Sequence, residues 1–470
     1  MNISKKLLLA IPVLLLMVSC GEDFTILAPQ SQRNVENFYQ TDSDFVTGIN
    51  GAYSGLADNK AYGRNYMLLH EMRSDNTEND GGATGLAESF QRIDRFNELT
   101  TATEMEETWA GGYEVIARTN TILNRIDDAS FDNPALSDRI RGEALFIRSL
   151  VYYNLAVTFG NIAEQFEEVT TPNVELNQVS ADVIYDRIAS DLSEAVNLLP
   201  ESYSGENVGR ATSGAAATLL GLVHLTNGND GQAETALRSV VQSNQYELIP
   251  AYQDIWGVEN KNNEESIFEI QFKSGGQGTG SPFTEYYSPN LSISGGVGGG
   301  NAPQAIPEEL LDEYDASDDR LNSFGVVDDD GAPYLNKYDG TQFAAFDGDN
   351  NFVVFRYADV LLMLAEAIGE SQESIDLIDE VRTRSGLTTS IADLPGSFSE
   401  KLLAERQREF VGENKRWPDL VRFGVAPQVM ADFLADEGIS TDDVRLLYPI
   451  PQREIDSSSG ALSQNPGILD

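Results

Sequence analysis

Apolar residues return every three or four positions through most of the region from residue 102 to residue 250. Within 139–159 the recurring apolar positions are Ile140, Ala144, Ile147, Val151 and Leu155. This spacing places them on one face of a helix, so that face is expected to be buried. The same pattern runs from Asp182 to Leu199 and stops at Pro200. The region is therefore predicted to consist of long helices that pack through one side.

Two further helices are predicted on either side of the turn at Gly228 and Asn229. The first carries the small residue Gly221, and the second carries the large residue Leu237. A small residue facing a large one lets paired helices approach closely, which is typical of tetratricopeptide repeats. A similar pair is predicted at 355–368 and 373–385. We predict a mostly α fold in which tetratricopeptide-like helical pairs form a scaffold, but not a regular solenoid.

The helical pattern breaks over residues 261–351. Glu265 to Phe272 alternates like a strand, and eleven of the 26 residues from 275 to 300 are Gly or Pro. Such a composition favours loops, and long loops on a rigid scaffold commonly carry function. We therefore predict a loop-rich, ligand-binding insertion with a few short strands. The helical scaffold would then cover about 35–260 and 352–436, with a closing segment at 437–470.

The chain begins with a pattern typical of a secretion signal. Lys5 and Lys6 precede the apolar run 7–18, and Ser19 precedes Cys20, the single cysteine of the chain. A run this short cannot span a bilayer, which takes about 20 apolar residues. We therefore predict that residues 1–19 are removed as a signal peptide and that the sulfur of Cys20 carries a lipid.

The composition narrows the classes of ligand and cofactor. With 75 acidic and 31 basic residues the net charge is −44, which repels nucleic acid. One cysteine and two histidines, His70 and His224, leave no Cys/His zinc site. The stretch 347–351 is rich in Asp, but Phe352 stands where a calcium-binding EF-hand has Gly. Calcium would need an irregular site, and we expect neither a metal nor a cofactor.

The last third of the chain holds several distinctive stretches. They lie at 356–367, where Arg-Tyr-Ala-Asp-Val leads to Ala-Glu-Ala, at 405–424, at 448–451 and at 464–467. The N-terminal part adds Leu27, Pro29, Phe38, Tyr39, Tyr53, Trp109, Tyr113 and Asn120. Together and in this order they resemble the SusD/RagB family of nutrient-binding outer-membrane lipoproteins, over one domain from residue 20 to 470. The chain departs from the family pattern at Asn414, where Gly is usual, and at Ile468, where an aromatic is frequent.

The residues of the stretch 405–424, called the C-terminal motif below, are expected to be structural. Their spacing suits ion pairs around helix ends, and the residues concerned are Glu405, Arg406, Glu409, Arg416 and Asp419. Asn414 is expected in the left-handed conformation, where Asn is the commonest substitute for Gly. Core positions are expected for Trp109, Trp256, Trp417 and His224.

The resemblance implies a function in nutrient uptake. Members of this family cap a SusC-type TonB-dependent transporter in the outer membrane, bind a glycan or sometimes a peptide at the cell surface, and deliver it for import. Glu22 and Asp23 after the cysteine resemble the acidic export signal of surface lipoproteins in Bacteroidetes. Since one lipid anchor gives only marginal attachment, a transporter partner would supply the second hold on the membrane.

Sugar binding normally uses an aromatic ring beneath the apolar face of the sugar. The aromatic candidates, expected to be partly exposed, are Phe283, Tyr286 and Tyr287, with Phe90 opposite them. A polar cluster lies where the family often places binding residues, and it contains Arg73, Asp75 and Asn76. We therefore predict binding of an oligosaccharide, with a peptide as the alternative ligand.

Two other classes of protein fit the sequence less well. A glycoside hydrolase would need two carboxylates that flank the scissile bond, but any pair among 75 acidic residues carries no information. A serine-hydrolase triad would depend on His70 or His224. A purely structural helical adaptor would not need a lipid anchor or an aromatic, Gly-rich insertion. We therefore predict a non-catalytic binding protein.

Overall fold

The computed structural model describes residues 38–79, 86–171, 176–288, 304–326, 333–340 and 342–468. The predicted signal peptide, Cys20, the acidic pair after it, Leu27 and Pro29 lie outside the described residues.

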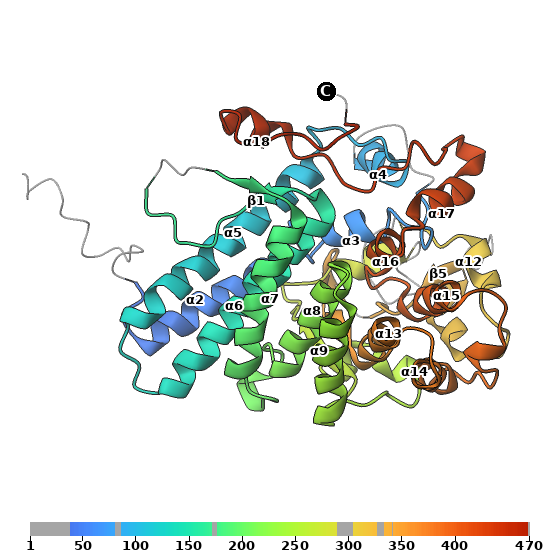
Figure 1. Cartoon of the computed structure of the whole chain (residues 1–470), viewed down its shortest axis with the longest axis horizontal. Helices are drawn as coiled ribbons and strands as arrows, with labels where there is room; N and C mark the ends of the chain where they lie inside the picture. Colours follow the sequence, from blue (N-terminus) through green and yellow to red (C-terminus); the bar gives the residue numbers. More distant parts are fainter. Residues whose placement is uncertain are drawn as a thin grey trace, which may run out of the picture.

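Long helices form a continuous row across the molecule (Figure 1). The row consists of α2 (Asp42–Leu56), α5 (Thr103–Arg125), α6 (Pro134–Phe159), α7 (Ala181–Leu198), α8 (Ser213–Thr226), α9 (Asp230–Ser243), α13 (Tyr357–Ile368) and α14 (Gln372–Arg384). From α5 to α9 each helix packs against the next one in the chain, and α13 then packs against α9. The insertion between α9 and α13 thus leaves the row of helices intact. The predicted mostly helical, tetratricopeptide-like scaffold is confirmed.

Further helices complete the structure around this row. They are α3 (Asn65–His70), α4 (Leu86–Asp94), α10 (Phe283–Tyr287), α12 (Glu308–Asp312), α15 (Phe398–Phe410), α16 (Arg416–Arg422), α17 (Ala426–Phe433) and α18 (Gln452–Ser457). Single 3-10 turns lie at Ile126–Asp128, Gly205–Asn207, Tyr252–Ile255, Val258–Asn260, Asp319–Ser323, Ile391–Asp393 and Ala435–Glu437.

Local sequence signals set the ends and the spacing of the scaffold helices. Asn133 caps α6 by accepting a hydrogen bond from the Ala135 backbone N–H, and Pro134 occupies the first turn. A Cβ atom added at Gly221 on α8 would lie 2.5 Å from Leu237 on α9. The pairing of a small with a large residue, expected from the sequence, is therefore confirmed at this helix contact.

The strands form small antiparallel pairs. The strands are β1 (Ile162–Ala163), β2 (Gln178–Val179), β3 (Ser266–Ile270), β4 (Phe324–Val326), β5 (Pro333–Leu335), β6 (Gln342–Ala344), β7 (Asp347–Gly348) and β8 (Phe352–Arg356). They pair as β1–β2, β3–β8, β4–β5 and β6–β7. The β3–β8 pair joins the two ends of the insertion, because β3 begins it and β8 leads directly into α13. The insertion is therefore closed on itself where it meets the scaffold.

Buried ion pairs hold the C-terminal motif against the insertion and the scaffold. Arg320 contacts Glu405 at 2.7 Å, and Arg356 contacts Glu409 at 2.6 Å. Arg406 contacts Asp419 at 2.7 Å, all with side chains at most a few per cent exposed. The structural role expected for these motif residues is confirmed. Although burial by itself raises the pKa of Glu405, the guanidinium groups around it, led by that of Arg320, lower it to about 2.

Most of the expected core residues are buried. Trp109, Trp256 and Trp417 all lie in hydrophobic clusters, as expected. His224 differs, because it is only half-buried on α8, and the expected core position is wrong. Partial burial lowers the pKa of its imidazole. Within the ranges that the structure describes, no helix combines the length and the hydropathy that crossing a bilayer requires.

Candidate ligand-binding site

The aromatic residues predicted as the binding platform lie in the protein interior. Phe283 and Tyr287 are 0% and 1% exposed, and Tyr286 is 9% exposed. They form the short helix α10 instead of a loop, and the ring centroids of Phe283 and Tyr287 lie 5.1 and 5.4 Å from that of Tyr338. The expected exposure of these rings is wrong, because packing against other aromatic rings outweighs the surrounding Gly-rich composition.

The predicted polar residue Arg73 is also buried. Its guanidinium carbon lies 3.9 Å from the ring centroid of Tyr448 and 5.1 Å from that of Trp417. It pairs with Glu98 at 3.2 Å and donates a hydrogen bond of 2.7 Å to the Arg445 carbonyl. These contacts hold the Arg73 side chain inside the protein, so its charge is not available to a ligand in this conformation.

Asp75 and Asn76 connect the segment after α3 to the C-terminal motif. Asp75 accepts two hydrogen bonds of 2.7 Å from the Arg416 guanidinium. Asn76 donates to the Glu71 carboxylate, which also accepts the backbone N–H groups of Gly412 and Asn414 at 2.7 Å. These contacts are internal to the protein. Phe90 on α4 is buried as well, so the seven predicted residues do not form one open surface.

Two other aromatic residues are exposed. Phe343 and Phe346 lie on the hairpin formed by β6 and β7 (342–348), and they are 66% and 52% exposed. In the part of the chain that the structure describes, they are the only aromatic side chains classed as exposed. Exposed apolar groups that gather on a surface usually mark a site of binding. The hairpin is therefore the candidate site.

Hydrogen bonds hold the hairpin rigidly against α10. The Glu285 carboxylate accepts the backbone N–H of Phe346 and a bond of 2.5 Å from the Gln342 amide. The Tyr286 ring lies beneath, with its centroid 6.0 Å from that of Phe346. Burial raises the pKa of Tyr286 to about 12, so its hydroxyl stays neutral. Tyr286, a predicted binding residue, thus supports an exposed ring instead of being one.

Acidic side chains attach the Gly-rich segment to the hairpin. Asp347 accepts the backbone N–H of Gly276 at 2.6 Å, and Asp349 accepts that of Ser274 at 2.9 Å. A Cβ atom at Gly280 would lie 1.9 Å from the Asp347 carboxylate, so only Gly permits this approach. Across the described ranges, no three acidic, His or Cys side chains gather in an arrangement that could hold a metal ion.

The chemistry of the hairpin suits a ligand with both apolar and hydroxyl groups. The two phenyl rings offer apolar faces on which a sugar ring can stack. Lys273 extends into solvent beside them, with its side chain 80% exposed and its ammonium group 3.3 Å from Asp349. This arrangement offers a ligand apolar faces for stacking and charged groups for hydrogen bonds.

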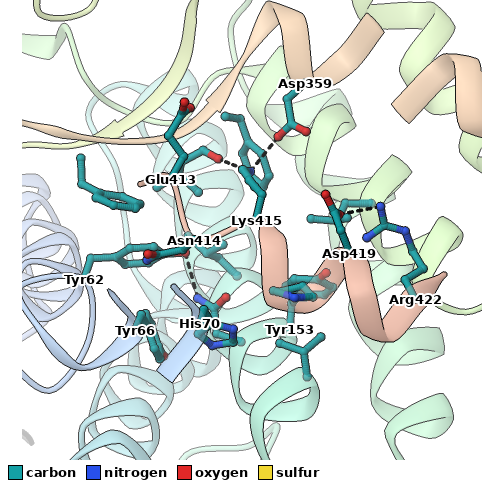
Figure 2. A pocket seen from close by; sticks show the side chains of 18 of the residues that line it. Tyr62, Tyr66, His70, Tyr153, Asp359, Glu413, Asn414, Lys415, Asp419 and Arg422 are labelled. Atoms are coloured by element: carbon teal, nitrogen blue, oxygen red, sulfur yellow. Dashed lines mark hydrogen bonds and ion pairs between the residues drawn. The ribbon is translucent and has the colours of Figure 1, made fainter. Parts of the chain in front are cut away.

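A central cavity between α3, α6, β8 and the C-terminal motif is the second place to consider (Figure 2). Tyr62, Tyr66, His70 and Asn414 of the motif are among the residues that line it (Figure 2). Asn414 has the expected left-handed backbone, with φ of 59°, and neither atom of its buried side-chain amide has a hydrogen-bond partner. Burial lowers the pKa of His70 to about 4, so its ring is neutral at pH 7.

The size of this cavity decides what it can hold. Its volume of about 50 Å³ holds roughly three or four water molecules. Waters there would satisfy the Asn414 amide, the Tyr66 hydroxyl and the His70 Nδ1 atom, which are otherwise buried without partners. An oligosaccharide does not fit. The exposed hairpin is therefore the better candidate for a glycan or a peptide.

Comparison with known families supports the resemblance seen in the sequence. Residues 29–225 match a family described as "Starch-binding associating with outer membrane". Residues 332–467 match the "SusD family". A SusD-like protein, P25, from Formosa agariphila is 25% identical over 96% of this chain and 95% of its own.

Solved structures with the same fold extend over nearly all of the chain. A surface glycan-binding protein A from Bacteroides fluxus has a TM-score of 0.81 and 26% identity, covering 91% of this chain and 100% of its own. A laminarin-binding SusD-like protein has a TM-score of 0.79 and 27% identity, covering 92% of this chain and 100% of its own. With family matches over residues 29–225 and 332–467, which together make up more than half of the chain, the chain belongs to the SusD/RagB family, a non-catalytic family associated with the outer membrane.

Proposed function

We propose that this protein binds a neutral glycan at the cell surface through the exposed rings of Phe343 and Phe346. The observation that carries the proposal is the exposure of these two rings on a hairpin that Glu285 and Asp347 hold in place. A rigid platform loses little conformational freedom on binding, so more of the stacking energy appears as affinity.

The ligand class is supported by similarity and by charge. One similar structure is that of a laminarin-binding protein and another is that of a surface glycan-binding protein. The net charge of −44 disfavours a polyanionic ligand. Laminarin, a neutral glucan, is therefore the first glycan to test.

The membrane anchor and the partner belong to the same proposal. Cys20, after the apolar run 7–18, would carry the lipid, and a SusC-type TonB-dependent transporter would receive the glycan. Changing Cys20→Ala should move the protein from the membrane fraction to the soluble fraction, and co-purification of a large barrel protein should be lost. Unchanged membrane partition of the variant would contradict the anchor.

The binding test compares the wild-type protein with the double variant F343A/F346A by isothermal titration calorimetry with laminarin. Each ring is expected to contribute on the order of 1 kcal/mol, so the double variant should bind roughly tenfold or more weakly. Leu99→Ala is the matched control, because Leu99 is also about half exposed (51%) but lies elsewhere. Laminarin binding by the double variant at wild-type affinity would contradict the proposed site.

A further inference from the structure

A second hollow lies along strand β3. It opens between the loop 201–212 and strand β3, and it is called the cleft below. Its lining residues are Glu201, Ser202, Tyr203, Val208, Gly209, Arg210, Thr212, Gln245, Tyr246, Asn262 and residues 266–269 of β3. Tyrosine rings beside amide, carboxylate and guanidinium groups are the combination that proteins use to hold sugar rings.

Neighbouring contacts fix the side chains of the cleft. Arg210 pairs with Glu143 at 3.3 Å and donates a bond of 2.7 Å to Asn50. The hydroxyl groups of Tyr246 and Thr212 are 2.8 Å apart. Arg210, the cationic side chain of the lining, is paired with Glu143, and the carboxylates of Glu201 and Glu269 also line the cleft, so its charge disfavours an anionic ligand and suits a neutral one better.

The volume of the cleft separates it from the central cavity. The cleft has a volume of about 150 Å³, room for roughly ten water molecules. That is the scale of one sugar ring, whereas the central cavity of about 50 Å³ holds only a few waters. Of these two hollows, only the cleft can therefore receive part of a glycan without movement of the protein.

Two sets of contacts and a short stretch of chain between them connect the cleft to the hairpin. A Cβ atom added to Gly209 would lie 2.7 Å from Gln271, and Gln271 exchanges hydrogen bonds with Asn262. Five residues farther along the chain, Gly276 lies against Phe343. A Cβ atom added to Gly276 would lie 3.2 Å from the Phe343 ring. Five residues of extended chain span at most about 18 Å. The two places are therefore near enough for one short glycan to reach both.

We infer that the cleft is a second saccharide subsite, which holds a distant sugar of the same glycan chain that stacks on Phe343 and Phe346. The inference rests on the proposed function at the hairpin and adds a dependence on chain length. A ligand that reaches both subsites gains affinity because its second contact is intramolecular. A shorter ligand contacts the hairpin alone.

The test measures affinity against chain length. Laminaribiose, laminarihexaose and laminarin are titrated into wild type and into Val208→Trp, which fills the cleft from an exposed position and removes no buried contact. Val169→Trp is the control, because Val169 is 47% exposed, close to the 46% of Val208, and does not line the cleft. A second variant, Tyr203→Ala, removes a ring of the cleft without adding bulk. If no laminarin ligand binds, the same titrations use starch and mannan with their oligosaccharides.

We expect both cleft variants to bind the hexamer and the polymer roughly tenfold more weakly and the dimer as wild type does. Wild-type affinity of Val208→Trp for the long ligands would overturn the cleft subsite and leave the hairpin proposal standing. Equal loss for short and long ligands would overturn the arrangement of two subsites. Binding that survives F343A/F346A would instead contradict the proposed function, and failure of every neutral glycan to bind would overturn both.

Discussion

The C-terminal motif and the β6–β7 hairpin use their side chains in opposite ways. In the motif, charged groups such as Glu405, Glu409 and Arg406 are almost wholly removed from water, and each is paired with a buried group of opposite charge. In the hairpin, the apolar rings of Phe343 and Phe346 face water. Burying charge in the motif and exposing apolar surface in the hairpin are thus both unfavourable contributions to the free energy of folding.

The difference teaches where stability and binding reside. A buried charge is strongly destabilising once its partner is lost, so each charged residue of the motif needs its ion-pair partner for the protein to stay folded. An exposed ring has few partners to lose, so it is free to take a ligand. Changes in the motif should therefore act on folding, and changes in the hairpin on binding. The following variants test that division.

The largest effect is expected from Glu409→Ala. Glu409 pairs with Arg320, Arg356 and Arg384. Its removal takes away a carboxylate that three buried guanidinium groups share. Loss of one partner from a buried ion pair typically costs about 3–5 kcal/mol of unfolding free energy. Urea denaturation followed by circular dichroism measures this loss. The control is Glu373→Ala, which removes the exposed ion-pair partner of Arg238 and should leave the midpoint of urea denaturation nearly unchanged.

A similar but smaller loss of stability is expected from Tyr287→Ala. The ring is buried, stacks on Tyr338 and belongs to α10, the helix whose Glu285 carboxylate holds the hairpin. Truncating a buried aromatic side chain typically costs about 3 kcal/mol or more. The variant should unfold at a lower temperature, measured by differential scanning calorimetry, and bind laminarin normally while folded. Unchanged stability together with lost binding would show that Tyr287 contacts the ligand and would contradict its structural role.

Acid should weaken the motif before it affects the hairpin. The pKa of Glu405 is lowered from 4.5 to about 2 in the folded protein, and that of Glu409 is lowered too. A depressed pKa means that the stabilisation is present above about pH 4.5 and is lost as the pH falls toward 2. The free energy of unfolding should therefore decline over this range, and Glu405→Gln should flatten the decline. An equally steep decline in the variant would show that other groups cause it.

The smallest effect is expected from Asn414→Gly. Asn414 has a φ of 59° and an unpaired buried amide, so Gly removes backbone strain and two unsatisfied atoms. We expect a stability within about 1 kcal/mol of wild type, measured by thermal denaturation. A large destabilisation would mean that the amide is held by ordered waters more tightly than their small number suggests.

Sequence patterns predicted the parts of the structure that depend on local spacing. Periodicity located the scaffold helices, Gly221 and Leu237 identified one helix contact, and the left-handed Asn414 followed from its place in the C-terminal motif. The binding surface depends on which of several aromatic residues finds a partner, and that is decided by tertiary packing. Phe283 and Tyr287 contact Tyr338, which lies some 50 residues away in the chain.

Phe343 and Phe346 did carry a signal in the sequence. They lie between Gly340 and Gly348, in a short segment bounded by turn residues, where a helix has no room to bury them. In the Asp-rich stretch beside them, Asp347 and Asp349 accept hydrogen bonds from backbone N–H groups of Gly276 and Ser274. Such contacts join segments some 70 residues apart, so composition alone could not predict them.

The most direct measurement is a crystal structure of the protein with laminarihexaose. We expect a sugar ring stacked on Phe343 or Phe346 at van der Waals distance, about 4 Å, with the buried ion pairs of the C-terminal motif unchanged. A glycan bound elsewhere, with both rings free of contact, would contradict the assignment of binding to the hairpin.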